Sequence, residues 1–153
     1  MKKTILTLGI TAAAFSQDLP FERGEINPYS KYFTGTTYLN TFDDASGGRS
    51  ANASLVTFEP CSRTHWHTHE KGQLLIILSG EGVVKIEGQK AIKATPGAII
   101  KIDSDAKHFH AGGKTTQMAH ISVMGMPNKT TWLEKASDKE YESVLRELQL
   151  KRF

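Results

Sequence analysis

Residues 65–73 read His65-Trp66-His67-Thr68-His69-Glu70-Lys71-Gly72-Gln73 and continue directly into Leu74-Leu75-Ile76-Ile77-Leu78. Side chains alternate between the two faces of an extended strand, so we expect His65, His67 and His69 to point the same way. Gly72 allows the chain to bend and bring Gln73 toward the same point. The apolar run that follows is typical of a strand buried on both faces. The stretch therefore predicts a metal site at the mouth of a buried core.

The other three histidines, His108, His110 and His120, fall in one later segment. A hairpin centred on Gly112-Gly113 would place His108 opposite His120 on neighbouring strands, with Cβ atoms about 5 Å apart. A register shifted by one residue would instead turn His120 outward. All six histidines of the chain thus fall into two groups, which favours metal chemistry over six unrelated packed or surface histidines.

Length and composition are those of one soluble globular domain. The chain has 153 residues, of which 39% are hydrophobic and 23% charged. Without residues 1–16, which contain two lysines and no acidic residue, 17 basic and 16 acidic residues remain. Such a balance leaves no basic stripe, so nucleic acid is not an expected partner. Cys61 is the only cysteine, which excludes an internal disulfide and a cysteine-rich metal site.

The N-terminus has the pattern of a secretory signal. Met1-Lys2-Lys3 precedes a short apolar run from Thr4 to Ala14, and Ala14-Phe15-Ser16 is a small-x-small cleavage sequence. The run is too short for a permanent membrane anchor. We expect residues 1–16 to be removed and the mature protein to be exported, periplasmic or secreted, with no membrane attachment. The alternative is a buried N-terminal helix or strand in a cytoplasmic protein.

Short apolar segments separated by glycine and proline turns follow along the chain. We expect strands at residues 32–39, 53–58, 74–78, 83–86, 91–93, 98–102, 106–111 and 116–124. Many short strands without intervening helices favour an antiparallel sandwich or barrel. Residues 17–31, punctuated by Pro20, Gly24 and Pro28, are expected to form an arm laid over it.

One helix is expected, at the C-terminus. Ser137-Asp138-Lys139-Glu140 is a capping-box pattern. Tyr141, Val144, Leu145 and Leu148 follow with helical spacing and form one apolar face, which we expect to cover an opening or flank of the barrel. The expected organisation is a signal peptide at 1–16, an arm at 17–31, the barrel at 32–134 and the helical segment at 135–153.

These motifs resemble those of the cupin superfamily. His67-x-His69-x-x-x-Gln73, with six residues between Gln73 and Gly80, resembles the first cupin motif, in which the third ligand is usually Glu. Pro96-Gly97 followed by His108 resembles the second motif. Further segments are similar to small bacterial cupins that include manganese-dependent hydroxynitrile lyases and related quercetin-dioxygenase-like cupins: Tyr32-Phe33-Thr34-Gly35-Thr36, Thr57-Phe58-Glu59-Pro60, Arg63-Thr64, Lys107-His108-Phe109-His110 and Met118-Ala119-His120.

The resemblance implies an all-β fold, an antiparallel jelly-roll (cupin) β-barrel with an N-terminal arm and a C-terminal helix. It implies one divalent metal ion held by His67, His69, Gln73 and His108. Mn²⁺ is the expected ion and Fe²⁺ the next choice, with Zn²⁺, Ni²⁺ and Cu²⁺ as alternatives. His120 is the expected catalytic residue, and His110 and Thr64 are further catalytic candidates. A homodimer is also implied.

Three functions remain open at this point. A hydroxynitrile lyase would use the ion as a Lewis acid and His120 to handle a proton during cyanohydrin cleavage or formation. A metal-dependent oxygenase would act on enol, catechol-like or alkene substrates. A non-catalytic cupin would bind the metal and a small ligand. In each case the partner is a small molecule.

Overall fold

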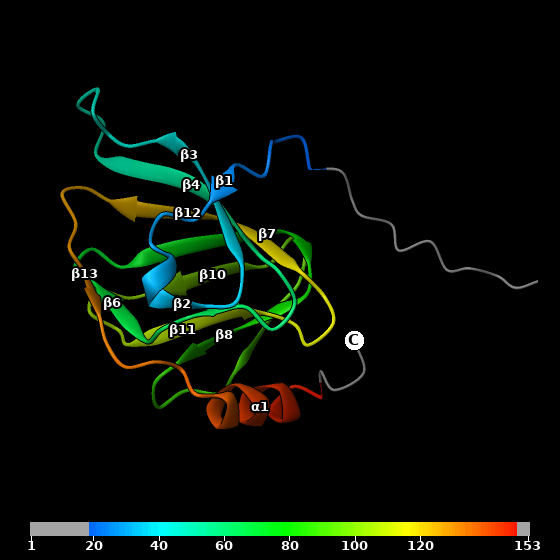
Figure 1. Cartoon of the computed structure of the whole chain (residues 1–153). Coiled ribbons are helices and arrows are strands. Elements are labelled where there is room, and N and C mark those ends of the chain that lie inside the picture. The colour runs from blue at the N-terminus through cyan, green and yellow to red at the C-terminus, as the bar shows by residue number, and fades with distance from the viewer. Residues whose placement is uncertain (1–18, 150–153) are drawn as a thin grey trace, which may run out of the picture.

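A computed structural model describes residues 19–149 of the chain, and its ribbon is shown in Figure 1. The expected signal sequence, residues 1–16, lies outside these described residues. Within residues 19–149, no helix has the length and apolar character needed to cross a bilayer.

The molecule is a sandwich of two antiparallel sheets with one helix on its outer side (Figure 1). Sheet A has six strands in the order β1-β3-β4-β12-β7-β10, with the bounds Glu25–Ile26, Thr37–Asp43, Ala51–Phe58, Met118–Gly125, Gln73–Gly80 and Ile99–Ile102. Sheet B has the order β13-β6-β11-β5-β2, with the bounds Thr130–Trp132, His67–His69, His108–Gly112, Arg63–Thr64 and Phe33–Thr34. Its strands β8 (Gly82–Ile86) and β9 (Ile92–Ala94) extend from β11. The predicted all-β antiparallel architecture is confirmed.

The main core lies between the inner faces of the two sheets. In β7, Leu75 and Ile77 are buried against residues of β8 such as Val84 and Ile86. The alternate residues of β7 are only half-buried, so the expectation that this strand is buried on both faces is wrong. The reason is that the helix covers sheet B, whereas no helix of the described part of the chain covers the outer face of sheet A.

The C-terminal helix forms as its capping pattern predicts. α1 spans Asp138–Glu147, and Ser137 is its N-cap. The Ser137 hydroxyl accepts from the backbone N–H of Glu140, whose carboxylate in turn accepts from the backbone N–H of Ser137 at 2.8 Å. Tyr141, Val144 and Leu145 are buried in a second core formed with residues of the outer face of sheet B. The helix therefore covers a flank of the sandwich.

Arg63 in β5 fastens this helix to sheet B. Its side chain is only 3% exposed. The Nε–H group donates to the backbone carbonyl of Ala136 at 2.8 Å, and the guanidinium also pairs with the Asp138 carboxylate. The same cation lies 5.0 Å from the ring centre of Tyr141. The buried guanidinium thus binds the Ala136 carbonyl just before the helix and contacts Asp138 and Tyr141 in its first two turns.

The strand expected at residues 32–39 is interrupted. Residues Phe33–Thr34 form β2 of sheet B, and the chain then crosses to β3 of sheet A. Gly35 makes this corner with a φ of 78°, and a Cβ there would lie 2.4 Å from the Ser62 Oγ atom. Only glycine fits this close approach, so the corner replaces one long strand by two that serve different sheets.

The hairpin expected around Gly112-Gly113 is wrong. β11 belongs to sheet B, where His108 pairs with His67 and Ile86, whereas β12 belongs to sheet A. The connecting loop uses its backbone groups elsewhere, because the Gly112 N–H donates to the Ser62 carbonyl and the Gly113 N–H to the Glu81 carbonyl. The chain therefore passes from one sheet to the other, and His108 and His120 are not cross-strand neighbours.

Replacing Arg63 tests how strongly the helix depends on this anchor. We expect Arg63→Met to lower the free energy of unfolding by about 1–3 kcal/mol, because the Ala136 carbonyl loses its buried donor. Urea denaturation measures the loss. Arg146→Met, which removes a half-exposed cation paired with Glu142, should change stability by less than about 1 kcal/mol. Equal losses in the two variants would contradict the anchoring role.

Candidate metal centre

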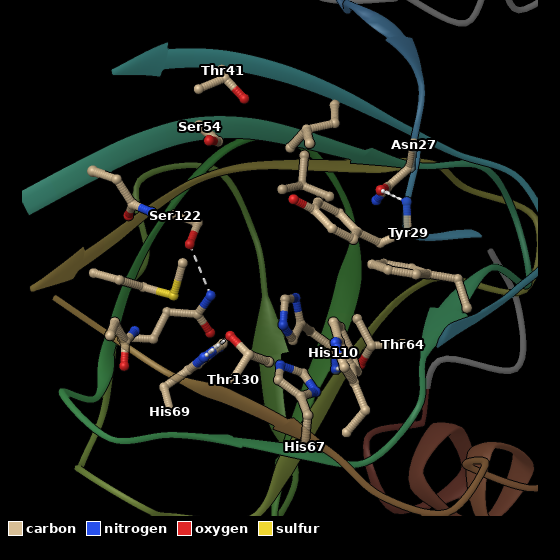
Figure 2. A pocket seen from close by; sticks show the side chains of 18 of the residues that line it. Asn27, Tyr29, Thr41, Ser54, Thr64, His67, His69, His110, Ser122 and Thr130 are labelled. Carbon is tan, nitrogen blue, oxygen red and sulfur yellow. Dashed lines mark hydrogen bonds between the residues drawn. The ribbon is translucent and has the colours of Figure 1, made fainter. Parts of the chain in front are cut away.

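A cavity of about 480 Å³ opens between the inner faces of the two sheets (Figure 2). Strands β6, β11 and β13 of sheet B bring histidine and tryptophan side chains to one wall. Strands β3, β4, β7 and β12 of sheet A form the opposite wall. His67, His69 and His110 line the cavity together with Gln73.

His67 and His108 meet because their strands pair in register. The Nδ1 atom of His67 lies 2.9 Å from the carbonyl oxygen of His65, and that of His108 lies 2.8 Å from the carbonyl oxygen of Ala106. A carbonyl only accepts, so Nδ1 carries the proton in each neutral ring and Nε2 keeps its lone pair. The two ring centres are 4.1 Å apart. Both imidazoles are thus oriented as ligands.

Gln73 points its carbonyl oxygen at the same place. Its Nε2 atom donates to the Ser122 hydroxyl at 2.8 Å, which leaves Oε1 facing His108 Nε2 at 3.2 Å. These two atoms are both acceptors, so they repel each other unless a cation lies beside them. Two ligand atoms bound next to each other at about 2.1 Å from one ion lie roughly 3 Å apart. The donor set therefore fits a divalent metal ion.

His69 completes the predicted ligand set. Its Nδ1 atom lies 2.9 Å from the Thr130 hydroxyl, and its buried Nε2 atom has no hydrogen-bond partner among the described residues. The ring centre of His69 lies 5.0 Å from that of His67 and 5.4 Å from that of His108. An unpartnered buried nitrogen beside two other lone pairs is what a metal ligand presents in the absence of its ion.

His110 and His120 form a hydrogen-bonded pair across the sandwich. His110 Nδ1 lies 2.8 Å from His120 Nε2, and the His110 backbone N–H donates to the Thr64 hydroxyl at 3.2 Å. The Nε2 atom of His110 is buried and has no partner in residues 19–149. His110 and Thr64 line the cavity, whereas His120 is fully buried behind His110 and does not.

Two overlapping groups of residues can hold the ion. The imidazole nitrogens of His67, His108 and His110 all lie within 4.8 Å of one another and are buried, so these three can bind a metal ion together. The set expected from sequence shares His67 and His108 and uses His69 and Gln73 in place of His110. The two groups have His67 and His108 in common, and the choice between them remains a prediction.

His65 does not lie with the other histidines. Strand β5 ends at Thr64 and β6 begins at His67, and the chain turns between them because the His65 N–H donates to the Tyr32 carbonyl. The expectation that His65 points with His67 and His69 is therefore wrong. Its ring faces Tyr32, with centres 6.5 Å apart, and does not line the cavity.

Three contributors went unnoticed in the sequence. Ser122 holds the Gln73 amide, Thr130 holds the His69 ring, and the Trp132 ring lies 4.8 Å from that of His67. The β-branched and aromatic run Thr130-Thr131-Trp132 is a strand signal that could have indicated β13. Nothing in its local pattern indicates that this strand pairs with the histidine strand β6.

Burial keeps these histidines neutral at ordinary pH. Loss of hydration lowers the pKa of His69 and of His108 to about 4, and that of His120 to about 3. The pKa values of His67 and His110 are also well below the usual value, for the same reason and because neighbouring histidines would repel an added proton. Neutral imidazoles can bind a metal or accept a proton.

The lowered pKa values predict the pH dependence of stability in the metal-free protein. Unfolded histidines take up protons near pH 6.5 and the buried ones do not, so stability falls as pH drops below 6.5. The loss is at most about 1.4 kcal/mol per pH unit for each neutral buried histidine. Urea denaturation of chelator-treated protein at pH 7.5 and 5.5 measures it. His120→Leu should reduce the pH dependence, and a stability independent of pH would contradict the prediction.

Comparison with known proteins agrees with this architecture. Residues 54–124 match the family described as cupin domain. The chain is 34% identical over 112 residues to (R)-mandelonitrile lyase from Granulicella tundricola, a match that covers 72% of this chain and 86% of that protein.

Solved structures share the fold. A cupin-like protein from Thermotoga maritima has 29% sequence identity and a TM-score of 0.79, and the match covers 83% of this chain and 97% of that chain. A second Thermotoga maritima protein, a predicted oxalate decarboxylase, has 20% identity and a TM-score of 0.60 over 66% of this chain and 90% of its own. With two antiparallel sheets around inward-facing histidines and this identity to a known relative, the chain belongs to the cupin family.

Proposed function

We propose that the protein is a metal-dependent lyase of the hydroxynitrile lyase type, which cleaves or forms cyanohydrins. Two features support this proposal. The 34% identical relative is a mandelonitrile lyase. The cavity also brings a group of buried neutral imidazoles into contact with a space large enough for a small organic molecule.

We assign His67, His69, Gln73 and His108 as ligands of one ion, with Mn²⁺ as the first choice. Imidazole nitrogens and an amide oxygen are all neutral donors, so the ion keeps its full charge, whereas a glutamate in place of Gln73 would cancel part of it. A bound divalent cation of this kind supplies Lewis-acid polarisation of a substrate hydroxyl.

His110 is the residue that we assign to proton transfer, and its position is the observation that carries the proposal. It lines the cavity beside His67 and His108, with ring centres 5.3 and 5.7 Å away. When its Nδ1–H donates to His120 Nε2, its own buried Nε2 holds a free lone pair. We assign this atom as the base that takes the proton of a substrate hydroxyl.

His120 then has a supporting role. The sequence favours His120 as the residue that handles the proton, with His110 and Thr64 beside it. Because His120 lies behind His110, we assign it to holding the His110 ring in one tautomer and stabilising the charged ring. Thr64, which accepts the His110 backbone N–H, fixes the strand at this point.

In cyanohydrin cleavage the proton of the hydroxyl moves to His110 Nε2, and the oxygen forms the carbonyl double bond. The bond between the carbinol carbon and the nitrile carbon breaks, and its electron pair leaves with cyanide. Cyanide then takes the proton from His110, which gives hydrogen cyanide and returns the neutral ring. Phe33 and Trp132 supply apolar walls for the ring of the substrate.

The ligand assignment predicts different metal contents for two alanine variants. His69→Ala should lose stoichiometric Mn²⁺ because a coordinating nitrogen disappears. His110→Ala should keep it. Elemental analysis of protein equilibrated with limiting Mn²⁺ measures both, with His65→Ala as a control outside the cavity. The reverse result would make His67, His108 and His110 the ligand set.

The assignment of proton transfer predicts a graded loss of activity. His110→Ala should lower kcat/KM for mandelonitrile cleavage by about 10²–10⁴-fold, with metal retained. His120→Leu should lower it by about 10–100-fold, because it removes only the residue that orients the base. His120→Gln, which keeps a hydrogen-bonding group, should recover part of this loss and shift the pH–rate profile.

The same samples distinguish the other functions. Oxygen uptake with enol or catechol substrates that is lost in His110→Ala, without any mandelonitrile cleavage by the parent protein, would replace the lyase by an oxygenase. A parent protein that binds Mn²⁺ and shows neither reaction would favour the non-catalytic cupin.

A further inference from the structure

The sheet A wall of the cavity changes from apolar to polar along the strands. The paired rows of inward side chains are, in order, Thr37–Phe58–Met118, Leu39–Val56–His120, Thr41–Ser54–Ser122 and, at the end of the wall, Asn52–Met124. Each row lies about 7 Å from the next, because it is two residues further along its strands. The third row therefore places three hydroxyl groups side by side on three strands.

Two of these hydroxyl groups, those of the exposed Thr41 and the half-buried Ser54, lie where the cavity meets solvent. Ser122 binds the Gln73 amide, but the hydroxyls of Thr41 and Ser54 make no hydrogen bond to any residue within 19–149. Both residues line the cavity, on the side opposite His67 and His110 in Figure 2. Neighbouring strands are about 4.8 Å apart. The two side chains thus offer a pair of donors and acceptors to whatever fills that part of the cavity.

The remaining lining residues are mixed, with Asn27 and Tyr29 among them as well as Met124 and Met126. Phe33, Leu39, Val56 and Trp132 form an apolar part beside the histidines, where the Phe33 and Trp132 rings are 5.7 Å apart. No lysine or arginine is among the residues that line the cavity in the described part of the chain. Its one carboxylate, Asp44, follows directly after β3 at the polar end. An anionic group would meet no cationic side chain there.

The volume exceeds that of a simple aryl cyanohydrin. A dry cavity of about 150 Å³ is enough for benzene, and sites for drug-sized ligands begin at about 300 Å³. At about 480 Å³, this cavity has room for a ring, a reacting carbon and a further arm.

We propose that the ligand of this site is an uncharged two-part molecule, with an aromatic or alicyclic ring against Phe33 and Trp132 and a hydroxyl- or amide-bearing arm bound by Thr41 and Ser54. This proposal narrows the substrate class of the proposed function. It rests on that function only for the position at which the reaction occurs. It names the class of substrate as a carbinol whose ring carries a polar arm, rather than one with an unsubstituted ring.

Four unreactive probes test the polar arm by titration calorimetry on the Mn²⁺-loaded protein. They are benzyl alcohol, 3- and 4-(hydroxymethyl)benzamide, which add an uncharged arm, and 4-(hydroxymethyl)benzoate, which has the shape of the 4-benzamide but a negative charge. We expect the better benzamide to bind roughly three- to tenfold more tightly than benzyl alcohol. The benzoate should bind more weakly than its amide, and a repeat with metal-free protein removes any contribution from carboxylate binding to the ion.

Variants that each lack one hydroxyl group test whether Thr41 and Ser54 bind the polar arm. Thr41→Val and Ser54→Ala remove one hydroxyl each with almost no change of shape, and each should weaken benzamide binding roughly two- to tenfold while leaving benzyl alcohol unchanged. Thr131→Val, on the exposed side of β13, should change neither. Equal affinity of the parent protein for benzyl alcohol and both benzamides would overturn the proposal. So would an equal loss for all probes in the two variants.

The two proposals fail in different ways. If the probes bind as expected and no cyanohydrin is cleaved, the ligand class stands and the lyase function falls. If mandelonitrile is cleaved and the benzamides show no advantage, the lyase function stands and the two-part ligand falls.

Discussion

Hydrogen bonds from the Nδ1 atoms of His67 and His108 to carbonyl oxygens two residues earlier set the character of the whole cavity. Each acceptor lies just before the strand that carries the ring, so ring orientation follows from the local backbone and needs no distant partner. With both Nδ1 protons used in this way, two lone pairs converge in a dry space between the sheets. Gln73 adds an oxygen with the same polarity. The other residues of the site either enclose this space or lie where they would feel the charge of a bound metal ion.

The two sheets supply different residues to the site. Sheet B carries His67, His69, His108 and His110, and its outer face is covered by α1, with Arg63 buried between strand and helix. Sheet A carries the graded wall that runs from Val56 to Ser54. Sheet A also supplies Gln73 and His120 to the histidine cluster, and Ser122 of the graded wall holds the Gln73 amide, so the two walls meet at this point.

Local patterns predicted local features well. The capping box at Ser137, the alternation that places His67 and His69 together and the antiparallel all-β class all follow from short-range spacing. Features that depend on how the chain passes from one sheet to the other cannot be predicted from short-range spacing. A Gly-Gly segment suits a hairpin as well as a crossing between sheets, and backbone groups of Ser62 and Glu81, distant in sequence, decide between them. The position of His65 was missed for the same reason, because the carbonyl that turns the chain belongs to Tyr32.

Phe58 lies fully buried with its ring centre 5.4 Å from that of His110 and 5.6 Å from that of His120. The two imidazoles come from opposite sheets, so their hydrogen bond forms only at one separation of the sheets at this point. The Phe58 ring packs against both imidazoles and fills the space beside them. The geometry of the pair therefore depends on the packing volume of a hydrocarbon side chain that takes no part in proton transfer. Evolution could tune the reactivity of such a barrel by swelling or thinning its core, with every polar residue unchanged.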